Sequence, residues 1–500
     1  MSRLGSHSFV RLLKCNVRCV RICGGQRFKS NEPSEFEHPV SRTIRVLKGD
    51  VKNYFSLPEG EKTFRKQHFL SGHCDVLVIG GGIMGSSIAY WLKQRARQGL
   101  HVVVVEKDPT VIPNNVLCYT SASTVLSVGG IRQQFSVPES IQMSLFGAEF
   151  LRNVKKHLYV EGHDPPDVQF TPTGYLFLAT EKGATQLEEN YKLQQELGAK
   201  NELLSPTKLK EKFPWLNTED IALGCHGLRD EGWFDPWSLL DGFKKKAINL
   251  GAEYIQGEAV GFKFKSMPDV MVEGVEPGTY EALDSLLIKT PSGDIHPIKF
   301  GLCVIAAGPQ SGAVAKMARI GNGAGYLQFP LPVEPRKRYV YAFNCPNGPG
   351  LNTPLTVDPT GAYFRREGLA GSFIGGRSPD VDKEPSTENL DVDHQFFDDY
   401  IWPHIAKRVK AFEGLKVNSA WAGFYEYNTF DANGIVGLHP YYQNLYLATG
   451  FSGHGIQHGP AVGRAVMEMI IDGGFKTIDL SRLSFDRIIT GNPILENNIW

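Results

Sequence analysis

Three glycines and one glutamate have the residue types and the spacing that bind a dinucleotide. Gly80, Gly82 and Gly85 form a G-x-G-x-x-G motif directly after the β-forming run 75–79. The first glycine allows a tight turn, the second lets the backbone approach a pyrophosphate, and the third lets the next helix pack closely on the strand. Glu106 follows a second β-forming run and is placed to accept hydrogen bonds from an adenosine ribose.

A complete β-α-β unit is needed to position these four residues. The sequence predicts a strand over 75–79, a helix over 86–98 and a second strand over 101–105. The N–H groups at the start of that helix, at its positive dipole end, would hold phosphates. A G-x-G-x-x-G motif outside this context is often only a glycine-rich turn. The unit predicts a nucleotide site, and alone it does not choose between FAD and NAD.

Two later stretches carry the same kind of signal. Residues 301–308 have the pattern of a buried strand that ends in small residues, and residues 444–449 have the pattern of another strand. A glycine-rich loop over 450–455 follows the second of these, before a helix at 461–471. The stretches between them are rich in β-formers. Further helices are expected over 182–197, 237–250 and 393–412.

The order of these signals predicts one fold that is interrupted twice by another. The fold class is α/β, with a Rossmann-like nucleotide-binding domain interleaved with an α+β substrate domain built on a largely antiparallel sheet. The nucleotide-binding domain is expected to be discontinuous, with segments 73–165, 225–325 and 420–480. The substrate domain is assigned to 166–224 and 326–419, and a C-terminal tail to 481–500.

Composition narrows the class of protein. The 500 residues are too many for one core, and the 53 basic and 53 acidic residues balance. That balance gives no charge field for nucleic acid, so no nucleic-acid partner is expected. No apolar run reaches the length of a transmembrane helix, so a soluble or membrane-peripheral chain is expected.

The first 31 residues differ from the rest. They are rich in arginine and lysine, and no acidic residue occurs before Glu32. On a helix, basic residues would share one face and valines and leucines another, which is typical of a mitochondrial transit peptide. The alternative is a basic disordered tail. We expect a transit peptide over 1–31, a polar lead-in over 32–72, and location in the mitochondrial matrix or at the matrix face of the inner membrane.

The eight cysteines do not indicate a metal or disulfide site. Three lie in the leader, and the other five are scattered without C-x-x-C spacing. They are expected to be buried thiols in a reducing compartment, and no metal is expected.

The three nucleotide signals, together with the turn 232–236 and the stretch 448–455, resemble the superfamily of D-amino-acid oxidase, glycine oxidase, sarcosine oxidase and dimethylglycine dehydrogenase. These are FAD enzymes, and the likeness spans roughly residues 74–474. It implies that the first unit binds the ADP half of FAD and that the backbone of Val260 contacts adenine. Further cofactor-binding candidates are Lys107, Ala122 and Ser123, Ala307 and Gly308 beside the pyrophosphate and ribityl chain, and Gly450, Phe451, Ser452, Gly453, His454 and Gly455 at the flavin pyrimidine.

The chain departs from this family pattern at informative positions. A lysine that holds the substrate carboxylate in sarcosine-oxidase relatives is replaced by Gln457. The positions that attach flavin covalently in other members correspond to Leu126 and about Phe424. The resemblance therefore implies non-covalent FAD and argues against a simple N-methyl amino acid as substrate.

Four residues are the catalytic candidates. In such enzymes a hydride passes from the carbon beside a neutral amine to flavin N5, and the protein orients the substrate. Tyr363 and Arg365 alternate onto one strand face, and a Tyr/Arg pair suits a carboxylate. Arg338 and His454 complete the set. The alternatives are ordinary surface arginines, half-buried tyrosines and a histidine that only holds its loop.

Two functions remain open from the sequence. With residues 333–341 and 419–423 included, the pattern resembles a mitochondrial family member associated with assembly of respiratory complex I. That likeness implies complex I subunits or assembly intermediates as partners. The alternative is an FAD-dependent oxidoreductase that acts on an unidentified small amine or amino acid.

Overall fold

The strand before the glycine motif is buried because its residues are apolar on both faces. In β1 (His73–Ile79), Val76, Leu77 and Val78 are completely buried. The helix α4 (Ile83–Ala96) follows, and β2 (Val102–Glu106) pairs with β1 in parallel. The predicted β-α-β unit is therefore confirmed.

The computed structural model describes residues 72–107 and 122–497. These residues belong to one compact unit, Leu70–Trp500. The predicted transit peptide and lead-in, together with four of the eight cysteines, lie outside the described residues. No described helix has the length and apolar character needed to cross a membrane.

The nucleotide-binding half is built on an eight-stranded sheet. Its central path runs β17-β18-β11-β1-β2-β8, and β10 and β9 extend it from β11. The strands β1, β2, β8, β11 and β18 are parallel neighbours. The three predicted nucleotide loops therefore follow the carboxyl ends of neighbouring strands, where ligands of such sheets bind. The bounds of the added strands are β8 (Glu253–Gln256), β9 (Glu258–Ser266), β10 (Glu281–Lys289), β11 (Ile295–Ile305), β17 (Ile435–Leu438) and β18 (Leu445–Thr449).

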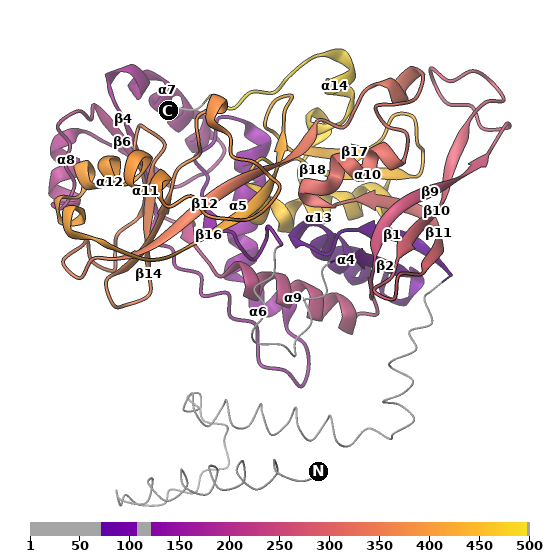
Figure 1. Ribbon diagram of the computed structural model, residues 1–500, viewed down its shortest axis with the longest axis horizontal. Coiled ribbons are helices and arrows are strands. Elements are labelled where there is room, and N and C mark those ends of the chain that lie inside the picture. Colours follow the sequence, from indigo (N-terminus) through magenta and orange to yellow (C-terminus); the bar gives the residue numbers. More distant parts are fainter. Residues whose placement is uncertain (1–71, 108–121, 498–500) are drawn as a thin grey trace, which may run out of the picture. The chain divides into compact units, whose positions relative to one another are not determined.

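Successive side chains of a strand point to opposite faces of the sheet, and in this sheet both faces are apolar. Val76 and Val78 of β1 belong to one core cluster, and Leu77 and Ile79 belong to another. The first cluster includes residues of five helices, and the second includes residues of β9, β10 and one short helix (Figure 1). The five helices are α4, α5 (Pro138–Arg152), α6 (Val154–Leu158), α9 (Pro236–Asn249) and α13 (Gly455–Asp472), and the short helix is α10 (Ser311–Met317).

A second eight-stranded sheet forms the other half, with order β16-β12-β15-β14-β13-β4-β6-β5 (Figure 1). All its pairs are antiparallel except β13 with β4. The predicted antiparallel substrate sheet is confirmed. The domain boundaries expected at residues 225 and 420 fall inside β6 and β16. The strands are β4 (Tyr175–Ala179), β5 (Asn201–Leu204), β6 (Leu223–Gly227), β12 (Val333–Asn344), β13 (Leu355–Val357), β14 (Tyr363–Glu367), β15 (Ser372–Gly376) and β16 (Lys416–Asn428).

Helices cover this second sheet, and a short ribbon connects the two halves. The ribbon pairs β3 (Gly130–Ile131) with β7 (Gly232–Trp233).

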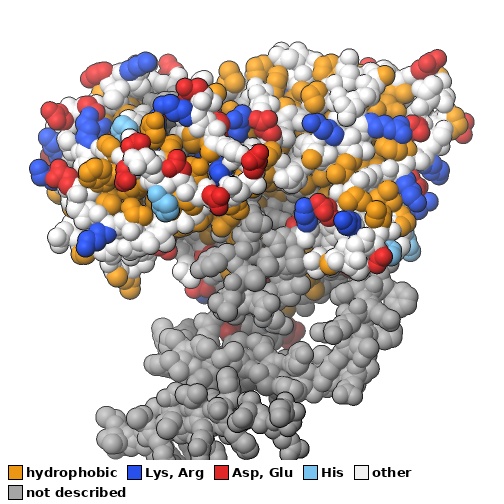
Figure 2. Space-filling view, in the orientation of Figure 1, with side chains coloured by type: hydrophobic (Ala, Val, Ile, Leu, Met, Phe, Trp, Pro, Cys, Tyr) orange, Lys and Arg blue, Asp and Glu red, His pale blue; other side chains and the backbone are white. Residues whose placement is uncertain are grey.

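In Figure 2, basic and acidic side chains lie interspersed over the visible described surface, in line with the balanced composition. The remaining helices are α7 (Glu181–Glu196), α8 (Pro206–Lys212), α11 (Gln395–Tyr400), α12 (Trp402–Arg408) and α14 (Asp486–Thr490).

Candidate active site

The glycines of the first loop are required for different reasons. A Cβ at Gly80 would lie 2.3 Å from the carbonyl oxygen of Ala306, and one at Gly85 would lie 1.8 Å from the carbonyl oxygen of Gly80. These two glycines therefore allow the close contact of strand, turn and helix. At Gly82 the nearest atom to an added Cβ is Oγ1 of Thr124, at 3.3 Å. Among the described residues, the only close neighbour of a Cβ added at Gly82 is thus a side-chain hydroxyl that would have to shift by a few tenths of an ångström, and no backbone atom blocks the position. This fits a backbone that a pyrophosphate approaches.

Glu106 lies where a ribose ligand is expected. Its Oε2 accepts a 2.6 Å hydrogen bond from the N–H of Gly81, so the end of β2 is tied to the glycine turn. The ammonium group of Lys107 instead forms an exposed 2.6 Å ion pair with Glu258. Val260 is the extra residue of a β-bulge between β9 and β10, and bulges disrupt the local ladder. This geometry suits a backbone that contacts adenine.

The other two predicted loops meet the first. Ile305 of β11 pairs with Ile79 of β1, which places Ala306 and Ala307 beside Gly80, and Gly308 follows in the same turn. After β18 the chain turns through Gly450, Ser452 and Gly453, all with positive φ. Ser452 has φ +47°, an uncommon conformation for a residue other than glycine. Its N–H donates to the carbonyl of Glu426 (2.9 Å), and its hydroxyl accepts from the N–H of Asn428 (3.0 Å).

The loop 450–455 borders a cavity of about 710 Å³ between the two halves of the described chain. Ser123, Arg338, Tyr363 and His454 are among the predicted site residues that line it. The loop 123–132, strands of the second sheet and the start of α13 form its walls. Other polar or aromatic lining residues include Arg132, Tyr175, Arg377, Phe424, Tyr425, Glu426 and Gln457.

Arg132 is the most buried arginine that lines this cavity, and no sequence motif indicated a role for it. One Nη of Arg132 lies 3.1 Å from Nε2 of His454, and its guanidinium carbon lies over the rings of Phe135 (4.4 Å) and Phe177 (4.9 Å). The pKa of His454 is held well below its usual value by burial and by the nearby Arg132 charge. His454 is therefore neutral at pH 7 and accepts the hydrogen bond.

Gln457 and Glu231 position the segment that carries Arg132. Oε1 of Gln457 accepts from the N–H of Arg132 (2.8 Å). The carboxylate of Glu231 accepts from the N–H of Gln133 (2.7 Å) and from the side chain of Gln134 (2.8 Å). Gln457, which stands where sarcosine-oxidase relatives have lysine, thus fixes the backbone of a different cation.

Arg338 and Tyr363 both line the cavity, as expected. The guanidinium of Arg338 forms a two-pronged ion pair with Glu384 (2.7 and 2.8 Å) and also donates to the hydroxyl of Tyr425 (2.8 Å). Its charge is already balanced by Glu384. Burial raises the pKa of Tyr363 to about 12, so its hydroxyl is neutral.

Arg365 requires a correction. It was expected to face a substrate together with Tyr363, but its guanidinium donates to the carbonyl of Val128 (2.9 and 3.1 Å) and to Glu367 (2.6 Å). The long side chain reaches past the strand face to the loop before β3. Arg365 is therefore a positioning residue for the segment that precedes Arg132.

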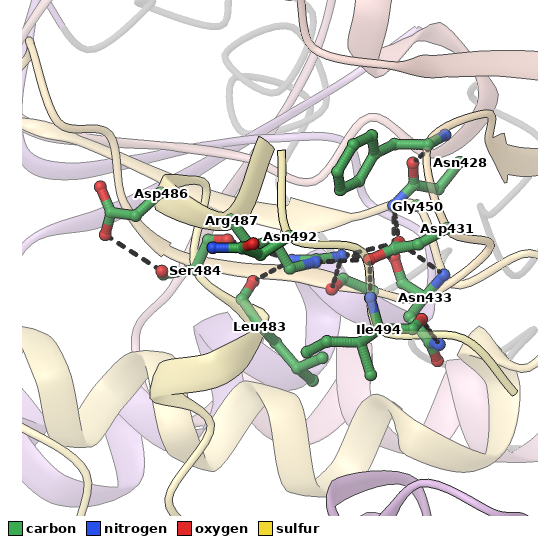
Figure 3. A network of polar contacts seen from close by, with 12 residues as sticks. Asn428, Asp431, Asn433, Gly450, Leu483, Ser484, Asp486, Arg487, Asn492 and Ile494 are labelled. Atoms are coloured by element: carbon green, nitrogen blue, oxygen red, sulfur yellow. Dashed lines mark hydrogen bonds and ion pairs between the residues drawn. The ribbon is translucent and has the colours of Figure 1, made fainter. Parts of the chain in front are cut away.

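The C-terminal segment, predicted only as a tail, is anchored beside the loop 450–455, which is called the flavin loop below (Figure 3). Arg487 of α14 forms a two-pronged buried pair with Asp431 (2.7 and 3.0 Å). Asp431 also accepts from the side chain of Asn428 (2.8 Å) and from the N–H of Ile494 (3.1 Å). A Cβ at Gly450 would lie 3.4 Å from Cβ of Asn428. This network therefore connects the last residues of the described chain to the end of β16 and the flavin loop.

The family's covalent attachment positions carry apolar side chains. Leu126 and Phe424 both line the cavity, and neither can bond to a flavin. The four described cysteines, Cys74, Cys225, Cys303 and Cys345, are buried away from the cavity lining. These residues support the prediction of non-covalent FAD.

Comparison with known proteins agrees with this geometry. The family model described as FAD dependent oxidoreductase matches residues 75–469. FAD-dependent oxidoreductase domain-containing protein 1 of Xenopus laevis is 53% identical over 430 residues, which are 85% of this chain and 84% of that protein. The Bos taurus protein of the same name is 48% identical over 461 residues, 91% and 93% of the two chains.

Among solved structures, L-proline dehydrogenase from P. horikoshii has a TM-score of 0.67 and 25% identity, covering 85% of this chain and 100% of that chain. Glycine oxidase from Geobacillus kaustophilus, at 19% identity and a TM-score of 0.64, shares the fold over 83% of this chain and 98% of its own. The chain therefore belongs to the FAD dependent oxidoreductase family, and its cofactor is FAD.

Proposed function

We propose that the protein is an FAD-dependent oxidoreductase that oxidises a small amine bearing a carboxylate. The observation that carries the proposal is Arg132, a buried cation in the cavity wall beside His454 of the flavin loop. Arginine binds carboxylates through two parallel hydrogen bonds. The positive charge of Arg132 in a desolvated site also disfavours a second cation, so the substrate amine is kept neutral.

The remaining lining residues have matching roles in this proposal. When bound, FAD supplies the acceptor for the hydride that leaves the substrate carbon. Tyr175 is buried, Tyr363 and Tyr425 are partly buried, and desolvation raises the pKa of each, so they present neutral hydroxyls. His454 stays uncharged and holds the guanidinium of Arg132. Arg338 is balanced by Glu384 and orients Tyr425.

Anaerobic bleaching of the bound flavin by a panel of amines tests this function. Carboxylate-bearing amines should reduce the flavin, and their decarboxylated analogues should do so weakly. Arg132→Met should raise the half-saturating concentration of the carboxylate substrate about 10- to 100-fold, since a hydrogen bond to a charged group contributes about 1.5–3 kcal/mol. The decarboxylated amine is the internal control, because its binding does not use the guanidinium. Equal effects on both amines, or no bleaching by any amine, would contradict the proposal.

We infer as a second role that the protein acts in mitochondria and supports assembly of respiratory complex I. The acid-free basic leader 1–31 supports import into the matrix. The family resemblance over residues 333–341 and 419–423 supports the assembly role, with complex I subunits or assembly intermediates as partners. Arg132→Met separates the two roles if the variant still binds FAD, because it removes the proposed substrate anchor and changes no residue of the FAD loops.

The second role is tested by re-expression in cells that lack the protein. The full chain should restore assembled complex I, and a chain without residues 2–31 should remain in the cytosol and fail to restore it. Native gels for complex I and cell fractionation are the measurements. Rescue by Arg132→Met at matched abundance would assign assembly to a scaffold role, and failure with FAD still bound would assign it to oxidation. Mitochondrial location of the truncated chain would show that the leader is not the signal.

A further inference from the structure

We propose that Glu426 is an additional FAD-binding residue, whose neutral carboxyl group donates a hydrogen bond to the cofactor between two of the glycine loops. This inference rests on the FAD cofactor and is independent of the proposed substrate. Glu426 lies near the end of β16 and lines the cavity. The family motifs did not indicate it, because the signal is visible only when distant loops are brought together.

The carboxyl group of Glu426 touches two loops at once. A Cβ at Gly308 would lie 3.2 Å from Oε2, and a Cβ at Gly455 would lie 3.0 Å from Oε1. The two glycines therefore leave the space that this carboxyl group occupies. Gly308 follows β11 and Gly455 is the first residue of α13. Both glycines belong to the predicted FAD-binding set. The main-chain carbonyl of Glu426 also accepts from the N–H of Ser452, which fixes the strand to the flavin loop.

The environment of Glu426 favours its protonated form. Burial raises its pKa to about 7, although the N–H of Phe451 partly stabilises the charge. The charged groups on the adjoining strand β12 have other partners: Arg336 pairs with Glu334, Arg338 pairs with Glu384, and Lys337 donates to the side chain of Asn389 and to the main-chain carbonyl of Asp391. On β16 the titratable residues next to Glu426 are Tyr425 and Tyr427, and the neutral His454 stands directly before α13.

A neutral carboxyl group and a carboxylate would act differently on FAD. The ribityl hydroxyls and the flavin carbonyl oxygens accept hydrogen bonds, and a protonated carboxyl group can donate to them. A carboxylate only accepts, and it repels the phosphates and the negative charge of a reduced flavin. FAD binding then raises the pKa of Glu426 further. Affinity is therefore full below about pH 7 and falls as pH rises above it, by up to tenfold per pH unit.

The test measures FAD affinity and needs no substrate. Purified holoprotein is diluted in series at pH 6.5 and pH 8.5, and the fluorescence of released FAD gives Kd. The wild-type Kd should rise at least about tenfold between the two pH values. Glu426→Gln, which keeps the shape of the neutral acid and a donor, should bind as wild type at pH 6.5 and show less than about a twofold change at pH 8.5.

Glu231→Gln is the matched control. Glu231 is a second carboxyl group whose pKa burial raises to about 7, but it lies under the segment of Arg132. This variant should keep the wild-type pH dependence of FAD binding. A wild-type Kd that does not change between pH 6.5 and pH 8.5 would overturn the proposal even if a variant failed to fold. It would also be overturned if Glu426→Gln retained the wild-type pH dependence.

Discussion

Valine at Gly85 is expected to prevent folding, whereas valine at Gly82 should leave the protein folded and unable to retain FAD. At Gly85 an added Cβ would lie 1.8 Å from the backbone carbonyl oxygen of Gly80, and backbone cannot move aside without opening the strand–helix contact. Ordinary overpacking of a core costs about 1–3 kcal/mol, and this contact exceeds it because the obstructing atom belongs to the backbone. At Gly82 the backbone has φ −69° and ψ −167°, which any residue adopts, and the nearest atom is a side-chain hydroxyl at 3.3 Å.

Soluble yield, thermal unfolding and the flavin-to-protein ratio measure these outcomes. Gly82→Val should unfold within a few degrees of the wild-type apoprotein and lose at least about 100-fold in FAD affinity, because the side chain occupies the path of the pyrophosphate. Gly99→Val is the control, since a Cβ there would have open space around it. Normal FAD content in Gly82→Val, or normal unfolding of Gly85→Val, would show that the two glycines do not have these separate roles.

Removal of Arg487 should cost about 3–5 kcal/mol of stability, the penalty for breaking a buried ion pair. Its side chain is 5% exposed, and that of Asp431 is 0% exposed. Arg487→Met would leave the carboxylate of Asp431 buried without its cation. The same change should weaken FAD retention, because Asn428, held by Asp431, borders Gly450 of the flavin loop.

Denaturant unfolding at saturating FAD measures the effect. The double variant Asp431→Asn with Arg487→Met should be more stable than Arg487→Met alone, since it removes the unpaired charge. Arg95→Met, which removes an exposed ion pair with Asp472, should leave the unfolding midpoint unchanged. An unchanged midpoint for Arg487→Met would mean that the C-terminal segment does not support the fold.

The cofactor loops could be predicted from sequence because each is a local motif on a parallel strand. Glycine spacing identified the first loop, and short buried-strand patterns located the other two. The start of α9 was also visible locally: Asp235 accepts hydrogen bonds from the N–H groups of Trp237 (3.0 Å) and Ser238 (3.3 Å), with Pro236 at the first helical position.

The cavity could not be predicted in the same way. Arg132 meets His454 across 322 positions of sequence, and no periodicity encodes such a contact. The alternating direction of side chains along a strand placed Tyr363 and Arg365 on one face, but it could not tell where a long arginine side chain would end.

The helix expected over 393–412 is divided into α11 and α12, and Pro403 near the start of α12 explains the break.

The sheet order also has a consequence for the time course of folding. β1 pairs with β11, and β11 pairs in turn with β18, which ends at Thr449. The first nucleotide unit is therefore made early in synthesis but lacks its sheet neighbours until most of the chain is available. Pairings between such distant segments make folding slow and leave apolar strand edges exposed meanwhile. A nascent or truncated chain that ends before β18 would therefore depend on chaperones and be a substrate for proteolysis.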